Sequence, residues 1–182
     1  MWSNDPKEFA LHLRSLLHSG TATEKSDCLS FELLSDPIFA RQVAHNFGSL
    51  VHSLDLECFQ DHNVELFAWL FANGMAANFR QENTDHILGT MIYYYNPHGI
   101  GSIRLFREFL AHGANPNDVA MGGGVETNLH YAVHRFRNDL VQLMMQYGAD
   151  AQLKNEAGKT AFDVARESRN AEAIAILRRA GA

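Results

Sequence analysis

The sequence lacks any apolar run approaching the roughly 18 residues that a helical membrane span requires. Its first residues, MWSNDPKEFALHLRSLLHSG, have no basic start and are interrupted by charges, so they predict no signal peptide. Only two cysteines are present, Cys28 and Cys58, which excludes a disulfide-dense scaffold. We therefore expect a reduced, cytoplasmic setting and no membrane insertion, while export without an N-terminal signal stays open.

The chain also lacks a basic stripe. The net charge is −6, and all of it comes from residues 1–112, because residues 113–182 hold eight basic and eight acidic side chains. Nucleic-acid binders neutralise phosphates with clustered Lys and Arg, so we expect no nucleic-acid partner. The apolar fraction of 46% is ordinary for a globular protein with a buried core.

What the sequence does contain is an internal repetition. The segment TNLHYA (127–132) is followed 33 positions later by TAFDVA (160–165), and Gly148 is followed at the same interval by Gly181. Thr127 and Thr160 are good helix N-caps, because a Thr hydroxyl can accept from the free N–H groups of a first turn. Gly148 is suited to close the second helix in a left-handed conformation. Each unit therefore predicts a helix, a turn, a second helix and an extended hairpin.

This pattern resembles the ankyrin repeat, whose signature is T-P-L-H-x-A in a unit of this length. TNLHYA replaces the proline with Asn128, and TAFDVA keeps the Thr and the final Ala. GANPN (113–117) and GADAQ (148–152) are similar to the family's hairpin entry. The resemblance covers residues 113–182 clearly, and it implies an all-α, ankyrin-type helical solenoid.

The repetition continues upstream in a degenerate form over about residues 62–112. The positions eight, seven, four and three residues before each closing glycine form an apolar stripe, as a buried second helix requires: Leu140, Val141, Met144 and Met145 before Gly148; Leu105, Phe106, Phe109 and Leu110 before Gly113; Leu66, Phe67, Leu70 and Phe71 before Gly74. Arg178 replaces the last apolar residue in the final unit, which indicates the polar outer face of a terminal repeat.

Residues 1–61 show no repeat. Asn4 or Asp5 followed by Pro6 starts one amphipathic helix that stops at Gly20, and Asp36 followed by Pro37 starts a second that ends at Gly48. We expect these helices to form an N-terminal cap region over the repeats of residues 62–182, in one continuous core.

The resemblance further implies a non-catalytic protein–protein interaction module, an adaptor or scaffold that is expected to be a monomer. A bacterial effector that binds a host protein would be one context, by analogy. In this family, partners bind the hairpin tips and the exposed face of the first helices. Carried onto this chain, the partner-binding positions are Met121, Gly123, Gly124, Glu126, His134, Arg135, Tyr147, Glu156, Lys159 and Glu167. Ala157 and Ser168 belong to the same surface. No cofactor is implied.

Three alternatives remain open. The first is a metal site, since His130 and His134 have the spacing of two ligands on one helix face, although no third ligand is nearby. The second is an enzyme with a Cys/His site in the N-terminal half, such as Cys58 with Asp61 and His62. The third is a ubiquitin-ligase adaptor, because LSFELLSDPIF (29–39) faintly resembles the start of an F-box. In addition, the hairpin of residues 117–126 carries two extra residues, and it is either a tolerated insertion or a contact finger led by Met121.

Overall fold

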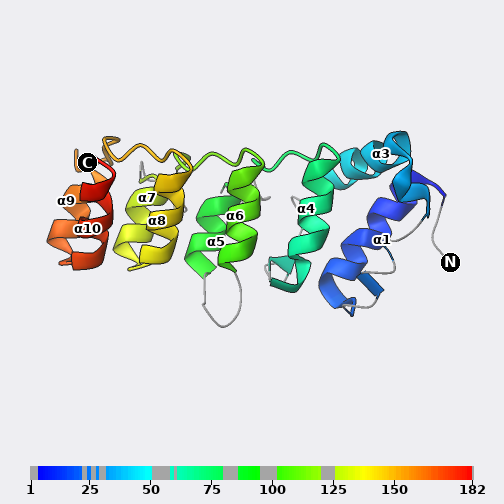
Figure 1. Cartoon of the computed structure of the whole chain (residues 1–182), viewed down its shortest axis with the longest axis horizontal. Coiled ribbons are helices and arrows are strands. Elements are labelled where there is room, and N and C mark those ends of the chain that lie inside the picture. Colours follow the sequence, from blue (N-terminus) through cyan, green and yellow to red (C-terminus); the bar gives the residue numbers. More distant parts are fainter. Residues whose placement is uncertain are drawn as a thin grey trace.

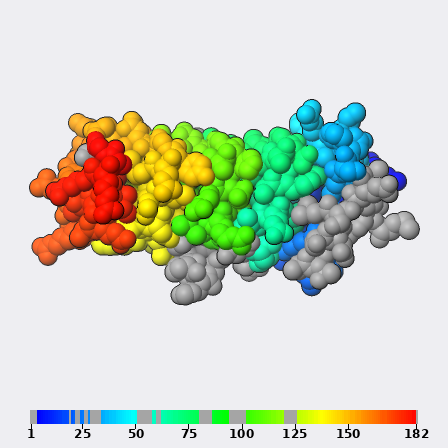
Figure 2. Space-filling model, viewed as in Figure 1, coloured from blue at the N-terminus to red at the C-terminus, as the bar shows by residue number. Residues whose placement is uncertain are grey.

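The chain is described here from a computed structural model, which describes residues 4–21, 24–25, 28, 32–50, 58–59, 61–79, 86–94, 102–119 and 126–181. Within these residues all regular secondary structure is helical, apart from isolated β-bridges such as Val119 with Thr127 and Lys154 with Thr160. None of the helices in these ranges is long and apolar enough to span a bilayer. The molecule is elongated, with the N-terminal and C-terminal elements at opposite ends (Figures 1 and 2).

The helices stand side by side in a row (Figure 1). Their bounds are α1 (Pro6–Ser19), α3 (Pro37–Gly48), α4 (Val64–Ala72), α5 (Ile87–Tyr94), α6 (Ile103–Ala111), α7 (Asn128–His134), α8 (Asn138–Gln146), α9 (Ala161–Glu167) and α10 (Ala171–Arg179), with 3-10 turns at Glu32–Ser35 and Asp61–Asn63. Helix α5 contacts α7 and α7 contacts α9, whereas α4, α6, α8 and α10 contact one another in the same order. The row therefore has two layers of helices, and the connections after α4, α6 and α8 run along one edge.

The expected helix ends recur at the expected glycines. Gly74, Gly113, Gly148 and Gly181 have φ values of 98°, 94°, 82° and 89°. A side chain at such a φ would be strained, so glycine is the residue that ends these helices at low cost. After Gly74, Gly113 and Gly148 the next amide bonds back to the helix in the same way: Met75 N to Leu70 O, Ala114 N to Phe109 O and Ala149 N to Met144 O, at 3.0, 2.9 and 3.0 Å.

The two threonine caps differ from each other. Thr160 accepts from the Asp163 amide and forms a capping box with it, as predicted. Thr127 occupies the N-cap position of α7, as predicted, but its side chain makes no cap bond. Its hydroxyl lies 2.8 Å from Nδ1 of His130 instead. In TAFDVA the corresponding residue is Asp163, whose carboxylate accepts from Thr160 and leaves the Thr oxygen available to the helix.

The predicted apolar stripes lie inside. All twelve positions before Gly74, Gly113 and Gly148 are buried except Met145, which is partly buried. Leu129 is fully buried, as the stacking of α7 requires. Arg178 is exposed at the C-terminal end, where its guanidinium lies 5.7 Å from the ring centre of Phe162. The long charged side chain thus covers an aromatic ring while its own charge stays in water.

The N-terminal part starts its helices as the sequence predicts. Asp5 caps α1 and Asp36 caps α3, each followed by a proline at the first helical position. Of the F-box-like segment 29–39, residues 29–31 lie outside the described residues. The rest is divided at Asp36 between the 3-10 turn and α3, so it does not form one uninterrupted helix. The buried apolar side chains of the described residues form a single cluster from Phe9 to Leu177.

Candidate binding surface

The hairpin between α8 and α9 is shaped by Asn155. Its side-chain oxygen accepts from the backbone amides of Ala157 and Lys159, at 3.1 and 3.0 Å. Its backbone N–H donates to the Lys159 carbonyl. Gly158 closes the turn with a φ of 71°, which a glycine adopts without strain. This turn presents Ala157 and Lys159 beside the start of α9.

His130 fastens this turn to α7. It is 1% exposed, and its Nε2 donates to the carbonyl of Lys159 at 2.9 Å while Nδ1 faces the Thr127 hydroxyl. Both ring nitrogens are therefore used: Nε2 holds α7 to the next hairpin, and Nδ1 bonds to the N-cap residue of its own helix. A metal-ligand role for His130 would require one of these bonds to break. In the described part of the chain no group of His, Cys, Asp and Glu side chains is arranged to hold a metal ion.

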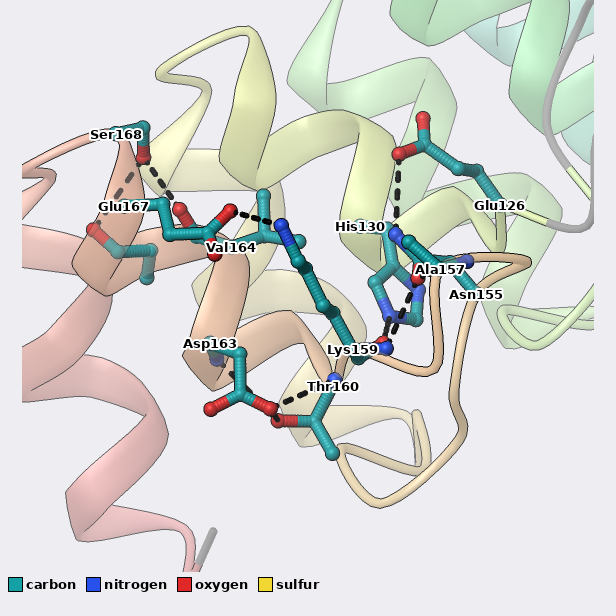
Figure 3. A network of polar contacts seen from close by, with 11 residues as sticks. Glu126, His130, Asn155, Ala157, Lys159, Thr160, Asp163, Val164, Glu167 and Ser168 are labelled. Atoms are coloured by element: carbon teal, nitrogen blue, oxygen red, sulfur yellow. Dashed lines mark hydrogen bonds and ion pairs between the residues drawn. The ribbon is translucent and has the colours of Figure 1, made fainter.

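A groove of about 430 Å³ opens between this hairpin and the first helices. We call it the Lys159 groove; it is lined by Glu126, His134, Asn155, Ala157, Lys159, Val164, Glu167 and Ser168. Figure 3 shows those of these residues that come from the two hairpin ends and from α9, whereas His134 comes from α7. Of the ten partner-binding positions that the resemblance implied, four line this groove: Glu126, His134, Lys159 and Glu167.

An ion pair forms one wall of the groove. Lys159 Nζ lies 2.6 Å from Glu167 Oε2, with the side chains 40% and 58% exposed. Exposed pairs of this kind contribute about 0–1 kcal/mol to folding, so the pair can be rearranged by a ligand at small cost. Both residues also line an adjoining hollow of about 410 Å³, together with Asp163 and Arg166. The pair therefore separates two neighbouring depressions on one face.

Asp163 belongs to the structure of α9. Hydrogen bonds from the backbone and hydroxyl of Thr160 hold the pKa of its carboxyl below the usual value. This carboxylate is engaged in capping the helix. Lys159, Arg166 and Glu167 are thus the groups of the adjoining hollow whose charges have no capping role.

The other described positions among the predicted ones do not line the Lys159 groove. Arg135 follows His134 at the end of α7, whereas Tyr147 ends α8. Because α7 and α8 are joined by the short turn of residues 135–137, they run in opposite directions, and the two residues lie at opposite ends of the pair. Glu156 is exposed at the hairpin but does not line the groove. Met121, Gly123 and Gly124 lie outside the described residues.

Three participants were missed by the sequence reasoning. Asn155 and Val164 line the groove, and Tyr93 of α5 packs on Arg135. The segment KNEAGK has an Asn three residues before a Gly, which is a turn signal that could have identified Asn155. The contact of Tyr93 depends on how α5 packs on α7, and no local pattern in the sequence indicates it.

The two cysteines of the N-terminal part lie in the buried core. Cys58 and Cys28 are both fully buried, and burial raises the pKa of the Cys28 thiol to about 12. Cys58 Sγ lies 3.4 Å from Nδ1 of His18, on α1. The sequence suggested a pairing with Asp61 and His62, whereas this contact of the Cys58 thiol is with a histidine of α1. A thiol nucleophile needs an accessible sulfur, whereas both of these thiols are buried.

Comparison with known proteins gives only partial similarities. No protein-family model matches the chain. It is 40% identical over 67 residues to the E3 ubiquitin-protein ligase hecd-1 of Caenorhabditis elegans, which covers 37% of this chain and 2% of that protein. It is 33% identical over 63 residues to Alpha-latrotoxin-Lg1a of Latrodectus geometricus, or 35% of this chain and 5% of the toxin. The chain thus matches only a small fraction of either relative's length.

Proposed function

We propose that this chain is a non-catalytic protein–protein interaction module of the ankyrin-repeat type, and that it binds a segment of a partner protein in the Lys159 groove. The observation that carries the proposal is the convergence of Glu126, His134, Lys159 and Glu167 on one groove. These residues come from two hairpins and two first helices, which is where the family resemblance implies binding.

The recurring geometry supports the family part of the proposal. Helix pairs α7–α8 and α9–α10 have their closing glycines, inter-helix turns and hairpin bridges at corresponding positions, 33 residues apart for Gly148 and Gly181. Such stacks of helix pairs leave an extended surface along one side, because each pair contacts only its neighbours. An extended surface suits a protein segment better than a small molecule, which prefers a closed and mostly apolar pocket.

The chemistry of the groove supports the binding part. Ala157 and Val164 provide apolar surface, and charged groups of both signs stand around it. An apolar centre with a polar rim is the usual anatomy of a protein interface. In addition, Lys159 and Glu167 are held only by each other at the surface, so their exchange of partners costs little.

The proposal can be tested with a displayed library of random peptides selected on the immobilised full chain. Ala157→Trp places a large ring in the Lys159 groove. Gln142→Trp is the matched control, because Gln142 lines a different hollow of about 260 Å³ on the α8 and α10 side. We expect the selected peptides to bind Ala157→Trp at least about tenfold more weakly, a loss of ~1.4 kcal/mol, and to bind Gln142→Trp like the unmodified chain.

Two outcomes would contradict the proposal. If no peptide is enriched over a support without protein, the groove does not bind protein segments. If the control variant loses the peptides and Ala157→Trp retains them, binding lies on the opposite layer of helices. Melting curves of both variants must coincide with that of the unmodified chain, since both substituted positions are exposed.

A further inference from the structure

Beside the Lys159 groove, Arg135 is held by two tyrosines. Its guanidinium carbon lies 4.7 Å from the ring centre of Tyr93 and 5.2 Å from that of Tyr131. The two rings are parallel within 3°, with centres 6.3 Å apart. The Tyr131 hydroxyl lies 3.2 Å from Nε and 2.9 Å from Nη2 of Arg135. The arginine is thus fixed in position although both it and Tyr93 face solvent, Tyr93 being 42% exposed.

The stacking of helices does not require this arrangement. The positions 33 residues further along the chain from Tyr131 and Arg135 are Val164 and Ser168. Ser168 only donates its hydroxyl to carbonyls of its own helix, at 2.8 Å for Val164 and 3.3 Å for Ala165. Helix α9 therefore ends in the same place without an arginine or a tyrosine. The cluster of Tyr93, Tyr131 and Arg135, which we call the arginine clamp, is an addition to α7.

The next residue, Phe136, adds to the exposed aromatic surface. It is 54% exposed and has a φ of 57°, in the left-handed region that a bulky residue rarely adopts. Arg169 has the same conformation, with a φ of 56°, so the turn demands it. A glycine or asparagine would meet this demand with less strain. Aromatic and arginine side chains are the residue types that most often dominate binding energy at protein interfaces.

The arginine clamp is suited to a carboxylate. A guanidinium has five N–H donors in a planar fork that matches a carboxylate with two parallel hydrogen bonds. Two of the donors of Arg135 are directed at Tyr131, and this contact raises the pKa of the guanidinium above its usual value. A side chain that is already held in place loses less conformational entropy on binding than a free one.

We propose that Arg135 receives a carboxylate from the same partner segment that occupies the Lys159 groove, so that the module selects acidic peptide segments. The proposal rests on the proposed function. His134, which lines the groove, directly precedes Arg135, so one segment can contact both. The groove and the adjoining hollow carry charges of both signs, so the preference for an acidic ligand comes from Arg135. The aromatic surfaces of Tyr93 and Phe136 accept an apolar neighbour of the acidic residue.

The first test uses the peptides selected on the unmodified chain. We expect Asp or Glu to be enriched at one position, next to an apolar residue, relative to the starting library. Selection on Arg135→Gln should remove this enrichment while the peptides still depend on the groove. If peptides that depend on the groove carry no acidic preference, the inference is wrong and the proposed function stands. If no peptide is enriched at all, both the inference and the proposed function are wrong.

The second test measures the affinity of one enriched acidic peptide by calorimetry. Replacing its conserved acid by the amide should weaken binding to the unmodified chain at least about tenfold, and Arg135→Gln should weaken the acidic peptide to the same degree. The two changes together should cost no more than either alone, because they remove one contact. Additive losses would contradict a direct contact between the acid and Arg135.

Tyr131→Phe provides a control for the role of the clamp. It keeps the ring against the guanidinium but removes the hydroxyl that accepts from it. We expect a smaller loss than for Arg135→Gln, and only for the acidic peptide, not for its amide form. An equal loss for both peptides would mean that Tyr131 supports the fold of the surface rather than the orientation of Arg135. Arg179→Gln, at the end of α10, should leave the affinity of the acidic peptide unchanged; a comparable loss there would indicate nonspecific attraction instead.

Discussion

The C-terminal helix pairs, α7 to α10, and the N-terminal part, α1 to α3 with residues 58–63, are held together differently. In the C-terminal pairs the long-range polar bonds join one helix pair to the next: His130 of α7 bonds to the Lys159 carbonyl, and Asn170 before α10 bonds to the Val133 carbonyl and to Asn138. In the N-terminal part the long-range polar bonds meet at one buried residue, Asn63. Lys25 donates to Asn63 at 2.6 Å, and Asn63 donates to the carbonyls of Leu17 and Cys58, at 3.1 and 2.8 Å.

The difference shows where each region uses its polar groups. Lys25 and Asn63 are buried and serve the packing of α1 on the segment before α4. In the C-terminal pairs, helix caps and the bonds of His130 and Asn170 between neighbouring pairs hold the structure, whereas the side chains of Lys159, Glu167 and Arg135 stand at the surface. Surface side chains that the packing does not require can vary for binding. We therefore place binding in the C-terminal pairs and assign a supporting role to the N-terminal part.

Removal of residues 1–61 should have the largest effect. It uncovers the buried stripe of Leu66, Phe67, Leu70 and Phe71, and it takes away Lys25, the partner of Asn63. Arrays of stacked helix pairs need capped ends to remain in solution. We expect the fragment 62–182 to aggregate or to lose much of its helical circular dichroism. A monomeric and fully helical fragment would mean that the N-terminal part is a separate domain.

Truncation of a stacking leucine should have the next largest effect. Leu129→Ala and Leu17→Ala each empty a fully buried site, one in each region, and should cost about 2–5 kcal/mol of unfolding free energy. If the regions form one cooperative unit, both variants lower the same transition in urea, seen equally by circular dichroism and by the fluorescence of Trp69. If each variant lowers a different transition, the two regions unfold independently.

Replacing Thr127 and Thr160 by alanine should lower the unfolding free energy by different amounts, although the two residues occupy corresponding positions. Thr160→Ala removes a helix cap and should cost about 1 kcal/mol. Thr127→Ala leaves the buried Nδ1 of His130 without its hydroxyl partner, and such a group costs about 1–3 kcal/mol. Urea unfolding of both variants gives the comparison. A larger loss for Thr160→Ala would show that the His130 contact contributes little.

The smallest expected effect concerns pH. Burial lowers the pKa of Lys25, with the nearby Cys58 acting in the opposite direction. Since the folded chain binds this proton less tightly than the unfolded chain, its contribution to stability rises with pH up to the ordinary lysine pKa of about 10.4. The slope is at most about 1.4 kcal/mol per pH unit. Lys25→Met should abolish this component of the pH dependence of unfolding, whereas Lys7→Met, at an exposed position of α1, should not.

The sequence predicted the elements that depend on local rules. The glycines at 74, 113 and 148 and the cap residues Asp5, Asp36 and Thr160 each act through neighbours a few residues away, so their roles can be derived from spacing. Thr127 takes the predicted N-cap position, but the spacing does not show which partner its hydroxyl has. The residue three positions later is His130 in one unit and Asp163 in the other, and of the two threonines only Thr160 accepts from a helix amide.

The sequence did not predict the contacts that depend on packing. Six of the eight residues that line the Lys159 groove were among the predicted surface positions, because hairpin tips and first helices can be located from the repetition. The arginine clamp was missed, because Tyr93 and Arg135 are separated by an insertion that breaks the spacing. The bond between Lys25 and Asn63 was missed as well, since neither residue belongs to a periodic pattern. Tyr147 was grouped with Arg135 because the spacing alone does not show that they lie at opposite ends of a helix pair.

Hydrogen–deuterium exchange of the full chain, with and without a selected peptide, tests the central claim most directly. A ligand in the Lys159 groove should slow exchange in the hairpin and first helix of the last pair, residues 155–168, and at the end of α7. Helix α10, which faces away from the groove, and helix α1 should exchange as in the free chain. Protection confined to α10 or to the N-terminal helices would contradict the account, because the binding surface would then lie on the other layer or in the supporting region.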